Sequence, residues 1–157
     1  MPWHLERSLL IPRPRAEVFA FFSDAINLER ITPSFLRFRI LTPAPIAMRA
    51  GTLIDYELRL YGVKFRWRTR IDAFEPPGHF IDVQLRGPYK AWRHRHAFEE
   101  VPGGTLMRDR VDYDLPFGPA GAVARALFVR RSVERIFDYR NKIILEILAP
   151  GADPVSG

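Results

Sequence analysis

The sequence predicts an α+β domain in which a curved antiparallel sheet of about seven strands wraps around one long C-terminal helix. Apolar and polar residues alternate through the middle of the chain, which is typical of strands with one buried face. Two short helical segments precede most of these strands, and one long apolar stripe with helical spacing follows them. We expect a single domain over residues 1–149 and a flexible tail over residues 150–157.

The first elements are expected to be a strand over residues 3–10 and short helices over residues 16–23 and 24–31. Prolines end the strand because proline cannot extend a ladder, and Pro33 ends the second helix because the residue before proline avoids the helical region. The strands that follow are predicted over residues 35–42, 52–60, 63–73, 80–86, 89–99 and 105–115.

The long helix is expected after a break at residues 117–119 and should end near Ala149. At 1.5 Å per residue, about 28 residues span about 42 Å, which is enough to cross the sheet. One helix cannot fill a curved sheet as a second sheet would, so we expect an internal cavity between the two. The apolar stripe of the helix comprises Ala122, Ala126, Val129, Val133, Ile136, Ile143 and Ile147.

The net charge of +6 and the pI near 10.2 raise the question of nucleic-acid binding. Acids interrupt the scattered arginines, however, and no run of five like charges occurs, so nucleic acid is not the expected partner. We assign Arg66, Arg68 and Arg70 to a solvated outer face of the sheet. The acids expected to balance them there are Asp55, Glu57, Asp82 and Asp112.

The composition also limits the compartment and the chemistry. The chain has no cysteine, which excludes disulfides and thiolate chemistry and agrees with a cytoplasmic location. No apolar run approaches the roughly 18 residues of a membrane span, so no integral membrane association is expected.

The strongest candidates for chemistry are His94 and His96, which are two residues apart on one strand and therefore point to the same face. Trp92 and Phe98 share that face, which indicates that it is the concave one. Folding the next strand back places Asp109 opposite His94 or, one pair further along, opposite His96. In either register Asp109 lies within cross-strand reach of one histidine, with side-chain roots about 5 Å apart.

The favoured interpretation of these three residues is a structural network, because a buried acid needs a partner. The alternatives are a polar anchor for a ligand carbonyl or hydroxyl, general acid–base catalysis with His94, His96 and Asp109 as candidates, and a facial metal triad. We expect no metal and no cofactor, because His4 and His79 look distant and solvent-facing.

Arg140 lies in step with the apolar stripe of the long helix. We favour a side chain that bends out to water along its stem; the alternative is a cation that faces the cavity and pairs with Asp109 or a ligand carboxylate. Phe35, Leu36 and the segment 43–48 are expected to gate the cavity. The complete set of expected ligand-binding residues is Tyr56, Trp67, Tyr89, Trp92, His94, His96, Met107, Asp109, Tyr113, Ile136 and Arg140.

The order of elements resembles the helix-grip fold of the START-like, or SRPBCC, superfamily, which includes pollen-allergen-like proteins, polyketide cyclases and lipid-transfer domains. The resemblance extends over about residues 3–148. Three stretches also resemble a bacterial branch of small ligand-binding, polyketide-cyclase-like proteins. They are Asp24-Ala-Ile-Asn-Leu-Glu-Arg-Ile-Thr-Pro33-Ser-Phe-Leu, Gly87-Pro-Tyr-Lys-Ala-Trp-Arg-His-Arg-His-Ala-Phe98 and Asp109-Arg-Val-Asp-Tyr-Asp-Leu-Pro-Phe-Gly118.

The resemblance implies binding or transport of a small hydrophobic molecule, such as a lipid, a polyketide or an aromatic compound. One alternative is an enzyme of the cyclase, aromatase or dehydratase type in which His94 or His96 moves protons, Asp109 orients it and Arg140 polarises a carbonyl. Another is an interaction domain that uses the basic surface. The expected oligomeric state is a monomer or a homodimer.

Overall fold

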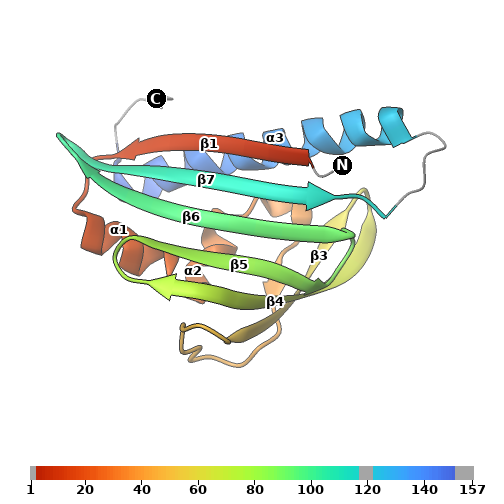
Figure 1. Ribbon diagram of the computed structural model, residues 1–157, viewed down its shortest axis with the longest axis horizontal. Helices are drawn as coiled ribbons and strands as arrows, with labels where there is room; N and C mark the ends of the chain where they lie inside the picture. Colours follow the sequence, from red (N-terminus) through yellow and green to blue (C-terminus); the bar gives the residue numbers. More distant parts are fainter. Residues whose placement is uncertain (1–2, 117–121, 151–157) are drawn as a thin grey trace.

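The computed structural model describes residues 3–116 and 122–150 and contains three α-helices and a seven-stranded sheet (Figure 1). The helices are α1 (Arg15–Phe22), α2 (Ala25–Ile31) and α3 (Ala122–Leu148). The strands are β1 (Trp3–Ile11), β2 (Arg39–Ile40), β3 (Leu53–Leu60), β4 (Val63–Glu75), β5 (His79–Arg86), β6 (Ala91–Val101) and β7 (Gly104–Asp114).

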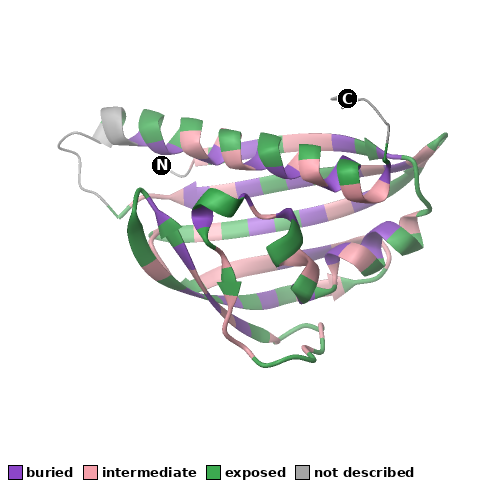
Figure 2. Cartoon of the chain, turned by 180° about the vertical axis from the view of Figure 1, so that it is seen from behind, coloured by how far each residue is buried: buried purple, intermediate pink, exposed green. Residues whose placement is uncertain are grey.

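The sheet has the order β1-β7-β6-β5-β4-β3-β2, and every neighbouring pair is antiparallel. Six strands therefore form a meander, and β1 returns to the far edge beside β7. The curved sheet and the long C-terminal helix confirm the predicted α+β helix-grip architecture. Figure 2 shows α3 lying along the sheet on the same side as α1 and α2.

The strand expected over residues 35–42 is largely wrong. Ser34–Leu36 form a 3₁₀ turn, and Arg37 takes a left-handed conformation with φ of 47°. Regular pairing with β3 is limited to Arg39 and Ile40, although the N–H groups of Leu41 and Thr42 also donate to the Asp55 carbonyl. The break expected at residues 117–119 and the tail after residue 150 lie outside the described residues.

The buried stripe of α3 differs from the expected one in the C-terminal half of the helix. Phe137, Arg140 and Ile144 occupy its centre, whereas Ile136 and Ile143 lie at its edges. Ala126, Val129 and Val133 are buried as expected, and the stripe then continues through 137, 140 and 144 at the same three- and four-residue steps. The charged Arg140 therefore faces the sheet directly.

The position of Asp82 on β5 differs from the expected outer face. In the structure Asp82 pairs with Ile71 on β4 and with His94 on β6, and all three residues line the cavity described below. The assignment of Asp82 to the outer face is therefore wrong.

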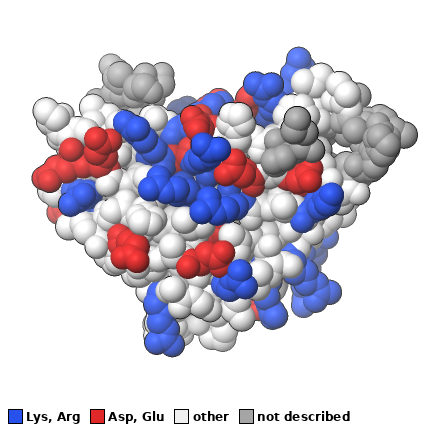
Figure 3. Space-filling view, in the orientation of Figure 1, with Lys and Arg blue, Asp and Glu red and all other residues white. Residues whose placement is uncertain are grey.

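The arginines that were assigned to the outer face of the sheet do lie on a solvent-exposed surface. Arg66, Arg68 and Arg70 are exposed, and Arg68 forms a two-bond ion pair with Asp55. Figure 3 shows basic and acidic side chains interleaved across this face of the sheet. Opposite charges this close together compensate one another and leave little uniform field.

Candidate functional site

A cavity lies between the concave face of the sheet and the helices α2 and α3. Its volume is about 180 Å³. An apolar cavity of about 150 Å³ in another protein holds one benzene molecule. The space here therefore accommodates a body of about one aromatic ring.

Aromatic side chains from three strands and the β5–β6 loop form one wall of the cavity. Tyr56 on β3 stacks on Trp67 of β4 with ring centroids 5.7 Å apart, and Trp67 meets Trp92 of β6 edge to face at 5.3 Å. Tyr89 packs against Trp92 at 4.8 Å. Rings held in contact on rigid strands give the cavity a fixed shape before any ligand enters.

A polar cluster, which we define as Asp82, His94, His96, Asp109 and Arg140, lies at another side of the cavity; all of its members except Asp109 line the cavity. The β6–β7 register pairs His96 with Asp109 across the strands, which is the second of the two predicted registers. The shortest bonds nevertheless run diagonally. His94 Nε2 lies 2.7 Å from Asp109 Oδ1, and His96 Nε2 lies 2.6 Å from Asp82 Oδ2.

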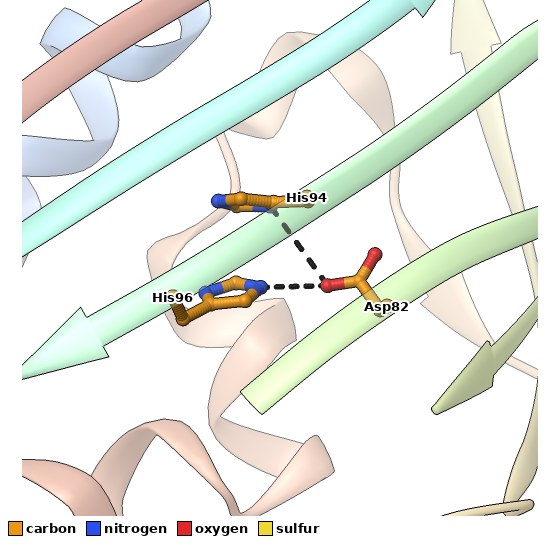
Figure 4. Close-up of side chains that lie close together, drawn as sticks. All are labelled: Asp82, His94 and His96. Atoms are coloured by element: carbon orange, nitrogen blue, oxygen red, sulfur yellow. Dashed lines mark hydrogen bonds and ion pairs between the residues drawn. The ribbon is translucent and has the colours of Figure 1, made fainter. Parts of the chain in front are cut away.

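The two imidazole rings stack on each other with centroids 3.6 Å apart, between Asp82 on one side and Asp109 on the other. Figure 4 shows both rings turned toward the Asp82 carboxylate, with one short and one longer contact. Phe80 stacks on the other face of His96 at 4.1 Å, which fixes this ring further. Because the adjacent strands β5, β6 and β7 hold both histidines and both carboxylates, this part of the cluster is preorganised.

Arg140 reaches down from α3 and donates from Nη1 to Asp109 Oδ1 at 3.3 Å. Its side chain is only 7% exposed, so the prediction that it bends out to water is wrong. Its guanidinium also lies over the rings of Phe22 and Phe137. Both the aromatic rings and the carboxylate attract a guanidinium cation.

The protonation states follow from burial and from the neighbouring charges. Burial would raise the pKa of Asp109, but the charge of Arg140 and the hydrogen bond from His94 hold that pKa well below its usual range. The pKa of Asp82 is also lowered, because its contacts with His96 outweigh its burial. Burial and the nearby His94 lower the pKa of His96 to about 4. At neutral pH both carboxylates are ionised and His96 is neutral.

Several buried polar atoms near the cavity have no hydrogen-bond partner among residues 3–116 and 122–150. They include Trp67 Nε1, His96 Nδ1, Asp109 Oδ2 and Arg140 Nε. An unpaired buried donor or acceptor costs about 1–3 kcal/mol, so native proteins seldom leave several together. These groups mark where a bound molecule or ion would contribute most.

The structure brings most of the sequence-predicted site residues to the cavity. Met107, Asp109 and Tyr113 are not among its lining residues. Met107 and Tyr113 are fully buried in separate apolar clusters, and Asp109 lies behind the histidines. The predicted residues that line the cavity are Tyr56, Trp67, Tyr89, Trp92, His94, His96, Ile136 and Arg140.

Sequence reasoning missed Asp82 as a site residue and Phe137 as its neighbour on α3. Phe137 could have been found from its three-residue step to Arg140, and Asp82 from its two-residue step to the apolar Phe80 and its pairing with His94. Of the expected gate, Leu36 and Met48 line the cavity, and the exposed Phe35 lies outside it.

A curved antiparallel sheet and a long C-terminal helix across its concave face define the helix-grip fold. The description "Polyketide cyclase / dehydrase and lipid transport" belongs to the family whose model matches residues 11–137. This chain belongs to that family, within the SRPBCC superfamily. No curated protein matches the chain.

Solved structures agree with the fold. Protein CV1439 from Chromobacterium violaceum superposes with a TM-score of 0.72 at 12% identity, covering 94% of this chain and 97% of its own. The Zhui aromatase/cyclase from Streptomyces sp. R1128 gives 0.67 at 15% identity, with 98% and 100% covered. A nucleoside-diphosphate sugar epimerase from Corynebacterium glutamicum is 30% identical over 75% of this chain, with a TM-score of 0.57, but only 25% of that longer chain is covered.

Within the described residues, α3 and the shorter helices all lack a stretch long and apolar enough to cross a membrane.

Proposed function

We propose that this protein binds a small, mostly apolar molecule that carries at least one oxygen, and holds it in the cavity as a carrier or sensor. The observation that carries the proposal is the division of the cavity into an aromatic wall and a polar wall. Ligand sites typically combine a large apolar lining with a few fixed polar groups, and this cavity has that composition.

The aromatic wall would hold the apolar body of the ligand. Trp67 and Trp92 offer ring faces and edges to an aromatic or short acyl group. The unpaired Trp67 Nε1 would donate to a ligand oxygen that reaches it. At about 180 Å³ the space favours a one-ring aromatic or a short acyl group over a multi-ring polyketide.

The polar wall would orient the ligand. Its oxygen would face His94, His96 and Arg140, which lie together at one wall of the cavity. A ligand without such an oxygen would leave these groups unpaired, at a cost of about 1–3 kcal/mol for each lost partner. We therefore expect phenols, aromatic acids and short hydroxy or keto acids to bind better than the matching hydrocarbons.

The first test is binding by isothermal titration calorimetry to a panel of such compounds, each paired with its hydrocarbon, together with native mass spectrometry of the purified protein. Leu58→Trp fills the cavity, and Leu53→Trp makes the same change on the same strand at an exposed position. We expect binding to disappear in the first variant and to remain in the second. Equal binding in the two folded variants, or no binding to any compound, would refute the proposal.

A cyclase, aromatase or dehydratase activity is a second candidate. The hydrogen bond between His94 Nε2 and Asp109 Oδ1 favours it, since a carboxylate that orients a histidine is a common general-base arrangement. Mass spectrometry of ligands incubated with the protein separates the two candidates. Loss of one water from the ligand, abolished in His94→Gln, would support catalysis, and recovery of unchanged ligand would support a carrier.

A further inference from the structure

Three ligand-type side chains converge at the polar wall of the cavity in a way that the binding proposal does not use. Asp82, His94 and His96 each offer one coordinating atom, and these three atoms all lie within 4.8 Å of one another. Asp82 and His94 are direct partners across β5 and β6, so the backbone itself fixes their spacing. In Figure 4 the contacts from both histidine rings meet at one oxygen of Asp82.

The hydrogen-bond pattern of His94 leaves one ring nitrogen without a suitable neighbour. An ionised carboxylate only accepts, so His94 Nε2 must donate its proton to Asp109 across 2.7 Å. In the neutral ring Nδ1 then carries a lone pair, and it faces Asp82 Oδ2 at 3.9 Å. Two acceptors face each other there with no proton between them.

His96 shows the same conflict on its opposite edge. Its Nε2 donates to Asp82 Oδ2 at 2.6 Å, which leaves Nδ1 with a lone pair in the neutral ring. That atom is buried without a partner, and its nearest charged neighbour is Asp109 Oδ1 at 3.6 Å, again an acceptor. Arg140 compensates only one of the two carboxylates, so one negative charge remains unbalanced when both rings are neutral.

We propose that Asp82, His94 and His96 bind a divalent transition-metal ion at the cavity wall. The ion would accept the lone pairs of His94 Nδ1 and His96 Nε2 together with Asp82 Oδ2. The proton of His96 would then reside on Nδ1 and point at Asp109, which provides the partner that this atom lacks. Two nitrogens and one carboxylate are a ligand set that such ions accept.

Asp109 would become the outer partner of both metal-bound histidines. Carboxylates in this position fix the tautomer and orientation of the imidazole, and their loss typically weakens metal binding 10–100-fold. The buried Arg140 fixes the position of Asp109 in turn. No metal was expected from the sequence because His4 and His79 look distant from His94 and His96; the inward-facing Asp82 supplies a third ligand that this reasoning did not consider.

Three protein ligands leave coordination positions free on the cavity side, because Asp82, His94 and His96 all line the cavity. A ligand oxygen held there would be polarised by the ion. This last role rests on the proposed function, but the metal site does not, and it can be tested without any organic ligand. A proton on one histidine is the competing explanation of the charge balance, and it predicts no stoichiometric metal binding.

The experiment uses untagged protein dialysed against a chelator and titrated with Zn²⁺ by calorimetry and with Co²⁺ by visible absorption. We expect one equivalent of each ion to bind to the wild type. Asp82→Asn should weaken binding at least 10-fold, and Asp109→Asn should weaken it 10–100-fold. The matched controls, the exposed Asp72→Asn and the exposed His4→Gln, should bind as the wild type does.

Circular dichroism verifies that each variant is folded, and Asp82→Asn changes no side-chain volume, so it remains informative if histidine variants unfold. No binding to the wild type, or equal binding to wild type and folded Asp82→Asn, would overturn the metal site. Loss of binding in His4→Gln would also overturn it. Binding of an aromatic acid that persists in chelator would show that the ligand proposal stands even where the metal proposal fails.

Discussion

Replacing Arg140 with methionine removes a buried charge but keeps most of the apolar stem. Arg140 and Asp109 are 7% and 1% exposed, and Nη1 lies 3.3 Å from Oδ1. Removing one partner of a buried ion pair costs about 3–5 kcal/mol, because the other charge stays buried without compensation. His94 still donates to Asp109, so we expect the lower end, about 3 kcal/mol at pH 7.

Urea denaturation at pH 7 measures this loss directly. Thermal melts provide a second measure. For a protein of this size a loss of about 1 kcal/mol of stability lowers Tm by roughly 2–4 °C, so the loss of about 3 kcal/mol should lower Tm by about 6–12 °C. The control Arg130→Met removes an exposed ion pair with Glu134 on the same helix and should cost less than about 0.5 kcal/mol. A loss below about 1 kcal/mol in Arg140→Met, or one no larger than in the control, would refute the assigned energetics.

A double variant tests the same argument from the other side. Asp109→Asn removes the charge that Arg140 compensates, so the loss in Asp109→Asn/Arg140→Met should be smaller than the two single losses combined. Additive losses would mean that the two side chains do not interact.

The pH dependence of stability reports on the same carboxylate. The pKa of Asp109 is lowered in the folded state, so its ionisation stabilises the protein above the unfolded pKa near 4. This contribution is lost as the pH falls.

Three further predictions follow from single residues. The folded-state pKa of His96 is about 4 against an ordinary value of 6.5, so protonation favours the unfolded chain. The free energy of unfolding from urea titrations should therefore fall by up to about 3 kcal/mol from pH 6.5 to 4, and less in His96→Gln. Gly104→Ala should destabilise strongly in thermal melts, because φ is +148° and a Cβ would clash with the Ile11 carbonyl oxygen, whereas Gly78→Ala should be nearly neutral. Phe19→Ala should cost about 3–5 kcal/mol in urea, since its buried ring packs on other phenylalanines.

Each of these three predictions has an outcome that contradicts it. A stability profile of the wild type that is flat between pH 6.5 and 4 would mean that His96 is not held neutral by burial. Equal melting temperatures for the Gly104 and Gly78 variants would show that β1 and β7 separate without cost. Phe19→Ala losing no more than the exposed Phe128→Ala would place Phe19 outside the core.

The sequence predicted the architecture because the alternation in β3, β4, β6 and β7 is a direct consequence of one buried face. Residues such as Tyr56 and Trp67 could be assigned inward by this rule, and they line the cavity. The rule did not place Asp82, a polar residue that lies on the inner face of β5 as the cross-strand partner of His94. Its position follows from pairing with a neighbouring strand, which the pattern of a single strand does not encode.

The polar cluster was only partly predictable for a related reason. The two-residue spacing of His94 and His96 fixes their shared face, and the hairpin turn brings Asp109 to them in either register. The position of Arg140 depends on the rotation of α3 by a fraction of a turn, which the apolar stripe defines only loosely. Its charge suggested solvent, whereas a buried partner reverses that preference.

The bond from α3 to the sheet also sets an order of events during synthesis. Asp109 and Arg140 are 31 positions apart, and α3 follows every strand in the chain. A growing chain therefore completes the sheet before α3 is synthesised, and until then the aromatic wall of the cavity is exposed to water and to chaperones. The docking of α3, which covers the cavity, is a late step. A nascent chain stalled before Ala122 would expose both the apolar aromatic wall and the carboxylate of Asp109 without its partner Arg140.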